Sequence, residues 1–175
     1  MRILLVGGSK SSKSHLAQEL CRKLGGKLYY WATMEPTDLE DLGRIERHVL
    51  DRDGWGFTTI ECGRHLHDAL PRIQPDSTVL FDSVTAYLAN EMFGETIDAD
   101  AAGRCAAELL QISTCPENFV CVCDELWRDG VRYDETTENY RAGLAHICRA
   151  LAEAFDVVYE VTAGIPKLWK GEMPQ

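Results

Sequence analysis

Short apolar runs alternate with amphipathic segments along the chain, at the spacings typical of strands and helices. Apolar strands that alternate with helices pack as a mostly parallel sheet with helices on both faces. The pattern therefore predicts an α/β fold in one domain over residues 1–175, with residues 167–170 in an anchored tail. The predicted strands cover residues 2–6, 27–32, 57–61, 77–81, 118–123 and 157–162. The predicted helices cover residues 13–24, 37–50, 66–72, 84–93, 98–112 and 136–155.

Composition narrows the classes of partner. Lys and Arg number 18 against 28 Asp and Glu, which gives a formal net charge of −10. This balance argues against nucleic acid or an anionic membrane surface as a partner. The chain has no apolar run near the length of a membrane-spanning helix, which is about 18 residues or more. We therefore expect neither nucleic-acid binding nor a membrane span.

The 7 cysteines show no CxxC pair and no regular framework. Cys121 and Cys123 alternate within an apolar strand, which favours reduced and mostly buried thiols rather than disulfides. The ligand spacing of a zinc site is missing as well. Because the chain also enters a strand at once, with no signal-peptide layout, we expect a cytoplasmic protein.

The first predicted strand runs into a small-residue loop that opens a helix at Lys-Ser. This is the layout of a phosphate-binding loop, whose backbone N–H groups converge on an anion at the start of the helix. In this pattern Lys13 reaches the β- and γ-phosphates, and the Ser14 hydroxyl binds Mg²⁺. The prediction is a P-loop NTPase-like fold that binds ATP or GTP with Mg²⁺. The predicted loop residues are Gly7, Gly8, Ser9, Lys10, Ser11, Ser12, Lys13 and Ser14.

The loop departs from the pattern GxxxxGK[ST] at one position, where Ser12 replaces the second glycine. We expect the Cβ of Ser12 to crowd the point where the loop closes on phosphate. The alternative to a nucleotide site is a Ser/Gly-rich connection that binds nothing.

Ligands of parallel α/β sheets bind beyond the carboxyl ends of the strands. Asp82 follows an apolar strand, in the position that usually supplies a second Mg²⁺ ligand beside a phosphate loop. It is equally suited to cap the following helix. Glu125 presents a similar choice between a metal or substrate role and a solvated strand end.

His48 lies near the end of the second predicted helix, beside Arg44 and Arg47. Neighbouring cations favour a neutral, nucleophilic imidazole and also bind phosphates. The alternative is a surface histidine placed favourably at a helix C-terminus. These residues alone favour the surface histidine.

Segments along nearly the whole chain resemble the bifunctional adenosylcobinamide kinase/adenosylcobinamide-phosphate guanylyltransferase family of cobalamin biosynthesis. The opening loop is similar to that family's GGxRSGKS, and residues 30–36 are similar to its YIATxxP. Several segments in the same order and spacing are more specific than any one of them. The other matches are residues 44–48 with RIxxH, 57–61 with WxTxE, 80–90 with LLDCLTxWLxN and 163–170 with SGIPxxxK.

The resemblance implies two reactions. A nucleoside triphosphate phosphorylates the aminopropanol hydroxyl of cobinamide, a corrinoid, and GTP then transfers GMP through a guanylylated histidine, which maps to His48. The resemblance also implies a homo-oligomer, specifically a trimer. We therefore expect catalytic roles for His48 and Lys13, and Mg²⁺ ligands at Ser14 and Asp82. Beyond the loop, the resemblance places five residues near the guanine nucleotide, namely Ala32, Thr33, Met34, Glu61 and Asp82.

The carboxyl-terminal segments depart from the family pattern. The family's TNEVGxGIVP reads here Cys-Asp-Glu-Leu-Trp-Arg-Asp-Gly-Val-Arg-Tyr over residues 123–133, which retains Glu125, Gly130 and Val131. Its FRDxxGxxNQ retains Arg141 but not the Asp, Asn or Gln. Two alternatives to the bifunctional enzyme therefore stay open. One is an enzyme with a single activity or another hydroxyl acceptor, and the other is a nucleotide-binding paralogue without catalysis.

Overall fold

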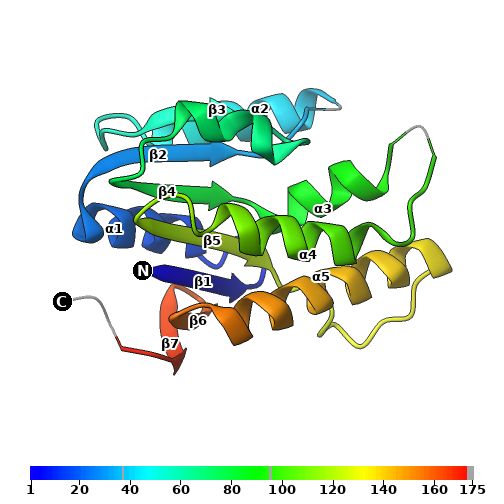
Figure 1. Cartoon of the computed structure of the whole chain (residues 1–175). Coiled ribbons are helices and arrows are strands. Elements are labelled where there is room, and N and C mark those ends of the chain that lie inside the picture. The colour runs from blue at the N-terminus through cyan, green and yellow to red at the C-terminus, as the bar shows by residue number, and fades with distance from the viewer. Residues whose placement is uncertain (37, 95, 173–175) are drawn as a thin grey trace.

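Seven strands form one sheet, in the order β3-β2-β4-β5-β1-β6-β7 (Figure 1). Every neighbouring pair is parallel except β6 and β7. This computed structural model describes residues 1–36, 38–94 and 96–172, without the side chains of Glu40, Asp41, Arg44, His48 and Asp51. The strands are β1 (Arg2–Gly7), β2 (Lys27–Ala32), β3 (Thr58–Glu61), β4 (Ser77–Asp82), β5 (Asn118–Asp124), β6 (Val157–Thr162) and β7 (Ile165–Lys170).

Helices cover both faces of the sheet. The helix α1 (Lys13–Leu24) packs on one face, against β4 and β5. The other face carries α3 (Val84–Met92), α4 (Ala101–Ile112) and α5 (Glu135–Ala154), together with the 3₁₀ helix η1 (Leu66–Arg72) (Figure 1). The remaining helix, α2 (Leu39–Asp51), lies near β2 and β3 at one edge of the sheet.

The central strands are apolar on both sides because each side faces a separate core. In β1, Leu4 packs into the larger core beneath α3, α4 and α5, whereas Ile3 and Leu5 pack into the core beneath α1. Strands buried on both faces read as continuous apolar runs rather than alternating ones. The predicted α/β class with a mostly parallel sheet is confirmed.

The order of the predicted elements is correct, and most boundaries fall within two residues of the structure. The predicted start of the second helix, Thr37, lies outside the described residues. The helix predicted from residue 98 begins at Ala101, because the Asp98 side chain accepts a hydrogen bond from the Asp100 N–H and holds a turn there.

One strand was not predicted. Residues 165–170, expected as part of a tail, form β7 at the edge of the sheet. Ala163 and Gly164 both have positive φ, 51° and 80°, and form the tight turn into β7. The expected anchoring of the tail is confirmed, because Lys170 Nζ donates to the carbonyl oxygens of Ala152 and Glu153 at 2.9 and 2.8 Å. Pro166 is tolerated because edge strands can lack a ladder donor.

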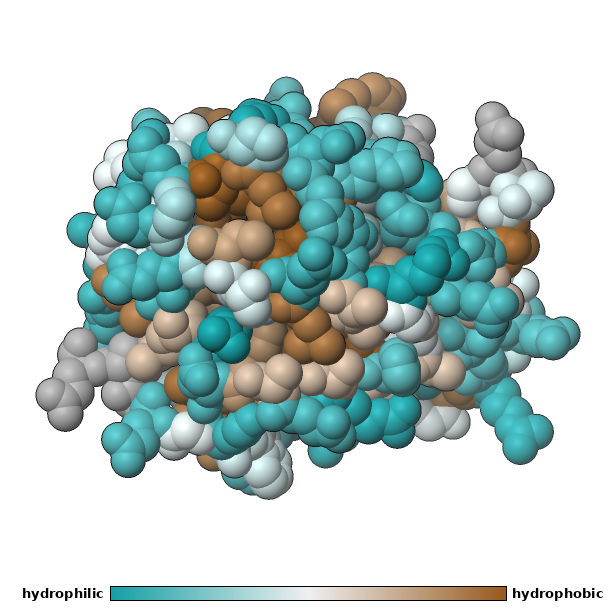
Figure 2. All heavy atoms as spheres, in the orientation of Figure 1, coloured by the Kyte–Doolittle hydropathy of each residue, from teal (hydrophilic) through white to brown (hydrophobic). Residues whose placement is uncertain are grey.

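The face shown in Figure 2 is mostly hydrophilic, and most of the cysteines are buried. Hydrophilic residues cover most of the face shown in Figure 2, where hydrophobic residues gather in a hollowed area. All seven cysteines belong to the described residues and are free, and most are buried, as expected. No described helix has both the length and the apolar character to cross a membrane.

The end of β1 packs closely against β6, and this contact predicts a difference between two neighbouring glycines. A Cβ on Gly7 would lie under 3.0 Å from the Val161 carbonyl oxygen and 2.9 Å from Ser11 Oγ, whereas a Cβ on Gly8 would meet nothing within 4 Å. Gly7→Ala should therefore lower the free energy of unfolding by about 1–3 kcal/mol, the usual cost of overpacking. Gly8→Ala is the matched control and should stay within about 0.5 kcal/mol of the wild type. Urea unfolding measures both, and equal stabilities would contradict the close packing.

Candidate functional site

The six parallel strands, β1 to β6, end at one edge of the sheet. The last residues of β1 to β5 are Gly7, Ala32, Glu61, Asp82 and Asp124. Four of these five were predicted as site residues, and the fifth, Asp124, was not. Because the strands are parallel, their carboxyl ends meet at the same edge, which is where ligands of such sheets bind.

The chain passes from β1 to α1 through a tight loop of residues 8–12. The Ser11 N–H donates to the Gly8 carbonyl oxygen at 3.3 Å, and the Ser11 carbonyl accepts from the Gly164 N–H at 3.0 Å. Lys10 and Ser12 have positive φ, 59° and 67°. The loop is therefore braced by its own backbone and by the turn between β6 and β7.

The structure gives a backbone reason for the glycine that the loop pattern demands at position 12. Ser12 adopts the left-handed conformation immediately before α1. Glycine enters this region without steric cost, whereas another L-residue is destabilised there by about 1–2 kcal/mol. The strain at Ser12 comes from its φ angle, in addition to the Cβ crowding expected from sequence.

The amino-terminal end of α1 has polar groups without partners. No side chain caps this end of the helix. Ser11 Oγ and Gln18 Oε1 are buried without a hydrogen-bond partner, although their residues line a cavity of 680 Å³ beside the loop. Uncapped N–H groups and the positive end of the helix dipole together favour an anion. The loop residues 9–14 line this same cavity.

Lys13 lies across the loop toward β5. Its ammonium donates to the Gly8 carbonyl oxygen at 3.2 Å and forms an ion pair with Asp124. Lys13 is buried, whereas the Asp124 side chain is 28% exposed and lines the cavity. The predicted phosphate-binding lysine is thus at the site, and a carboxylate holds it there.

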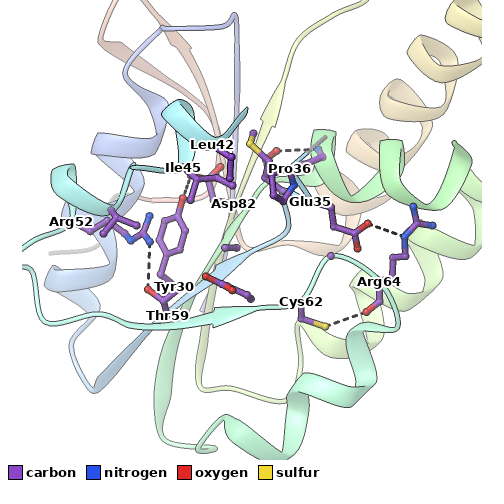
Figure 3. Close-up of a pocket in the computed structure, with 17 residues that line it drawn as sticks. Tyr30, Glu35, Pro36, Leu42, Ile45, Arg52, Thr59, Cys62, Arg64 and Asp82 are labelled. Carbon is purple, nitrogen blue, oxygen red and sulfur yellow. Dashed lines mark hydrogen bonds and ion pairs between the residues drawn. The ribbon is translucent and has the colours of Figure 1, made fainter. Parts of the chain in front are cut away.

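Asp82 lies where two cavities meet. Tyr30 Oη donates to Asp82 Oδ2 at 2.7 Å (Figure 3). Burial, and then the negative charge of Asp82, raise the pKa of Tyr30 well above its ordinary value, so the phenol keeps its proton and orients the carboxylate. The alternative role of Asp82 as a helix cap is wrong, because Ser83 Oγ accepts from the Ala86 N–H at 3.2 Å and caps α3 instead.

Thr33 lies behind the cavity walls and braces the Asp82–Ser83 segment. Its side chain is fully buried. Thr33 Oγ1 donates to the Ser83 carbonyl oxygen at 2.8 Å and accepts from the Ser83 N–H at 2.7 Å. In this structure its hydroxyl therefore positions the polar groups that border the cavities.

A second cavity of 580 Å³ opens beside the first, between α2 and the strand ends (Figure 3). The two cavities share Met34, Asp82 and Ser83. Apolar side chains of α2 form one wall, and the Arg52 guanidinium lies 3.7 Å from the centre of the Tyr30 ring. The predicted residues Ala32, Met34, Glu61 and Asp82 all line this cavity. Its size and its mixture of apolar walls with a few polar groups are typical of a small-molecule site.

The helix that carries His48 borders both cavities. Leu42, Ile45 and Val49 of α2 line the second cavity, and Arg47 lines the cavity beside the loop. The backbone of His48 belongs to α2. Its side chain, like that of Arg44, lies outside the described residues, so its predicted role stays a prediction.

Glu125, the other strand-end carboxylate considered from sequence, forms an ion pair with Arg128. Arg128 contacts Glu125 at 3.1 Å and Glu160 at 2.7 Å. The segment that follows is fixed by Arg141, a buried residue that donates to the carbonyl oxygens of Leu126 and Val131 at 2.7 and 3.0 Å. The charges of this segment therefore organise a loop.

The donor set near the loop suits a hard cation. Ser14, Asp82 and Asp124 line one cavity and offer only oxygen atoms, the donors that Mg²⁺ prefers. Within the described part of the chain, no group of three or more His, Cys, Asp or Glu side chains could hold a metal ion. A site with so few protein ligands matches Mg²⁺, which keeps several waters and takes phosphate oxygens as ligands.

Sequence reasoning missed three contributors to the site. Tyr30 and Arg52 stack against each other in the second cavity, and Asp124 pairs with Lys13. Tyr30 carried a readable signal, because a tyrosine two residues before the end of a buried strand needs a partner for its hydroxyl. Asp124 carried the signal of a carboxylate at a strand end, but its partner lies 111 residues away in sequence.

Comparisons with known proteins agree with this geometry. A family model described as cobinamide kinase / cobinamide phosphate guanyltransferase matches residues 3–168. The chain is 30% identical to the bifunctional adenosylcobalamin biosynthesis protein CobU of Salmonella typhimurium, over 94% of this chain and 97% of that protein. It is 29% identical to the protein CobP of Pseudomonas aeruginosa that carries the same description, over 98% of this chain and 99% of that protein.

The fold also has a distant counterpart among solved structures. A protein of Pyrococcus horikoshii OT3 aligns with a TM-score of 0.56 at 9% sequence identity, over 97% of this chain and 86% of that one. At this identity the likeness concerns the fold alone. The family match, in contrast, spans the phosphate loop, the strand ends around both cavities and the β6–β7 turn, and by it this chain belongs to the cobinamide kinase / cobinamide phosphate guanyltransferase family.

Proposed function

We propose that this protein phosphorylates the hydroxyl group of adenosylcobinamide with a nucleoside triphosphate and then transfers GMP from GTP to the resulting phosphate. The observation that carries the proposal is that the phosphate loop and Asp82 line the same cavity. The chain also belongs to the family whose members are described by these two activities. The second cavity supplies an adjoining site for the remainder of a nucleotide. We infer that Ala32, Met34 and Glu61 contact the nucleotide there, and that Thr33 holds the strand end in position.

The kinase step needs alignment and charge neutralisation more than covalent chemistry. The loop N–H groups and Lys13 would hold the phosphates and stabilise negative charge as the γ-phosphoryl group moves to the acceptor hydroxyl. Ser14 and Asp82 would hold Mg²⁺, which neutralises charge on the triphosphate when it is bound. The bond between the β–γ bridging oxygen and the γ-phosphorus breaks as the acceptor oxygen bonds to that phosphorus. The nucleoside diphosphate leaves, and the proton of the acceptor hydroxyl passes to solvent.

The guanylyl transfer divides into two displacements. A ring nitrogen of His48 attacks the α-phosphorus of GTP, a P–N bond forms, and pyrophosphate leaves. An oxygen of the cobinamide phosphate then attacks the same phosphorus and breaks the P–N bond, which releases free imidazole. Imidazole suits both steps because it is a good nucleophile and a good leaving group. The cationic side chain of Arg47, on the same helix as His48, lines the cavity beside the loop. This position supports the role of α2 in guanylyl transfer.

The proposed activity is tested by product analysis. The purified protein is incubated with adenosylcobinamide, GTP and Mg²⁺, and the corrinoids are identified by mass spectrometry. We expect the phosphorylated corrinoid and its GDP derivative. The phosphate alone would support an enzyme with a single activity, and recovery of unchanged corrinoid while GTP binds would support a nucleotide-binding paralogue.

The covalent step predicts a GMP adduct on His48. Wild-type protein incubated with α-labelled GTP and Mg²⁺ should retain label that is stable in alkali and lost in acid, because phosphoramidates are acid-labile. His48→Ala and His48→Asn should abolish both the adduct and guanylyl transfer while phosphorylation continues, since that step needs only the loop, the cation and an aligned hydroxyl.

The matched control for the adduct is His146→Ala, which removes an exposed histidine on α5. This variant should label like the wild type. Guanylylated product from a wild-type enzyme that forms no adduct would indicate direct transfer and would contradict the assignment of His48.

A further inference from the structure

The ammonium group that should meet the phosphates is already paired in this structure. Lys13 forms an ion pair with Asp124 and donates to the Gly8 carbonyl oxygen at 3.2 Å. An ammonium group has three N–H donors, so at most one is left for a ligand while both contacts persist. A triphosphate that binds with its β- and γ-phosphates at Lys13 must therefore compete with the Asp124 carboxylate.

The position of Asp124 is set by the sheet. Asp124 is paired with Gly7 in the parallel register of β1 and β5, so its carboxylate lies beside the start of the loop. Its N–H donates to Thr85 Oγ1 at 2.8 Å. Thr85 belongs to α3, which packs on β5. The carboxylate therefore extends from a backbone that is fixed on two sides.

The negative charge in this cavity makes the competition between a triphosphate and Asp124 for Lys13 depend on whether the triphosphate carries a divalent cation. Asp82 and Asp124 both line the cavity of the loop, so two carboxylates border the place where a triphosphate would bind. A metal-free triphosphate brings several further negative charges next to both of them, and in a partly buried site such repulsion is weakly screened. A divalent cation bound to the phosphates would neutralise much of the negative charge of the triphosphate. Its positive charge would also attract the two carboxylates.

We propose that Asp124 is a specificity-determining residue of the phosphate loop. It keeps Lys13 neutralised until a metal-bound triphosphate arrives, so that the site selects the metal complex against the metal-free nucleotide. This inference rests on the proposed nucleotide site. In this role the Asp124 carboxylate lowers the affinity of the site for the metal-free triphosphate.

The test compares two binding constants for each variant. Equilibrium dialysis measures the Kd of labelled GTP once with excess EDTA and once with excess Mg²⁺. Asp124→Asn should lower the Kd of metal-free GTP roughly tenfold, which corresponds to about 1.4 kcal/mol, and should change the Kd of Mg-GTP by less than a factor of about three. Asp124→Ser should show the same pattern, and thermal unfolding of both variants establishes that they are folded.

Asp76→Asn is the matched control. It removes the same charge from an exposed position just before β4, at the opposite edge of the sheet, and should leave both constants unchanged. An equal Kd of metal-free GTP in Asp124→Asn and wild type would overturn the inference. So would a loss of Mg-GTP binding with metal-free binding unchanged, because Asp124 would then be only a metal ligand. If the wild type binds GTP in neither condition, the proposed nucleotide site itself fails.

Discussion

The site depends on one close backbone contact at the end of β1. Gly7 packs so tightly against the carbonyl oxygen of Val161 in β6 that a side chain does not fit. On the other side of the strand, the Glu125 N–H donates to the Gly7 carbonyl oxygen at 2.9 Å. Farther along, the Gly164 N–H donates to the Ser11 carbonyl oxygen at 3.0 Å. The loop is thus held by backbone groups from three segments, which leaves the uncapped start of α1 facing the cavity.

The parallel sheet then determines which side chains face this loop. The six parallel strands end at one edge, and Asp82 and Asp124 come from the two strands beyond β1 in the order β1-β5-β4. Tyr30 orients Asp82 from β2, and Thr33 fixes the segment that follows Asp82. Because Asp82 borders both cavities, one ligand could contact the loop and the apolar second cavity together. The protein is acidic overall, yet it concentrates Lys10, Lys13 and Arg47 around the first cavity.

Sequence predicted the features that depend on local pattern. The strand, loop and helix of residues 2–24 are contiguous, and their periodicity and loop residues are readable without tertiary contacts. The strand β7 was missed because all of its residues are exposed, so no apolar alternation marks it. The pairing of Lys13 with Asp124 and the burial of Thr33 depend on strands that are distant in sequence. The left-handed φ of Ser12 was not predicted, because glycine is the residue that indicates such a conformation and a serine occupies this position.

We propose that the loop of residues 7–14 binds the phosphates of a nucleotide whose remainder extends past Asp82. A crystal structure with Mg²⁺ and a non-hydrolysable GTP analogue tests this binding mode. We expect β- and γ-phosphates within hydrogen-bond distance of the loop N–H groups and of Lys13, with Mg²⁺ near Ser14 and Asp82. We also expect Lys13 to turn from Asp124 toward the phosphates. Phosphates bound elsewhere, with Lys13 still paired to Asp124 and the loop empty, would contradict it.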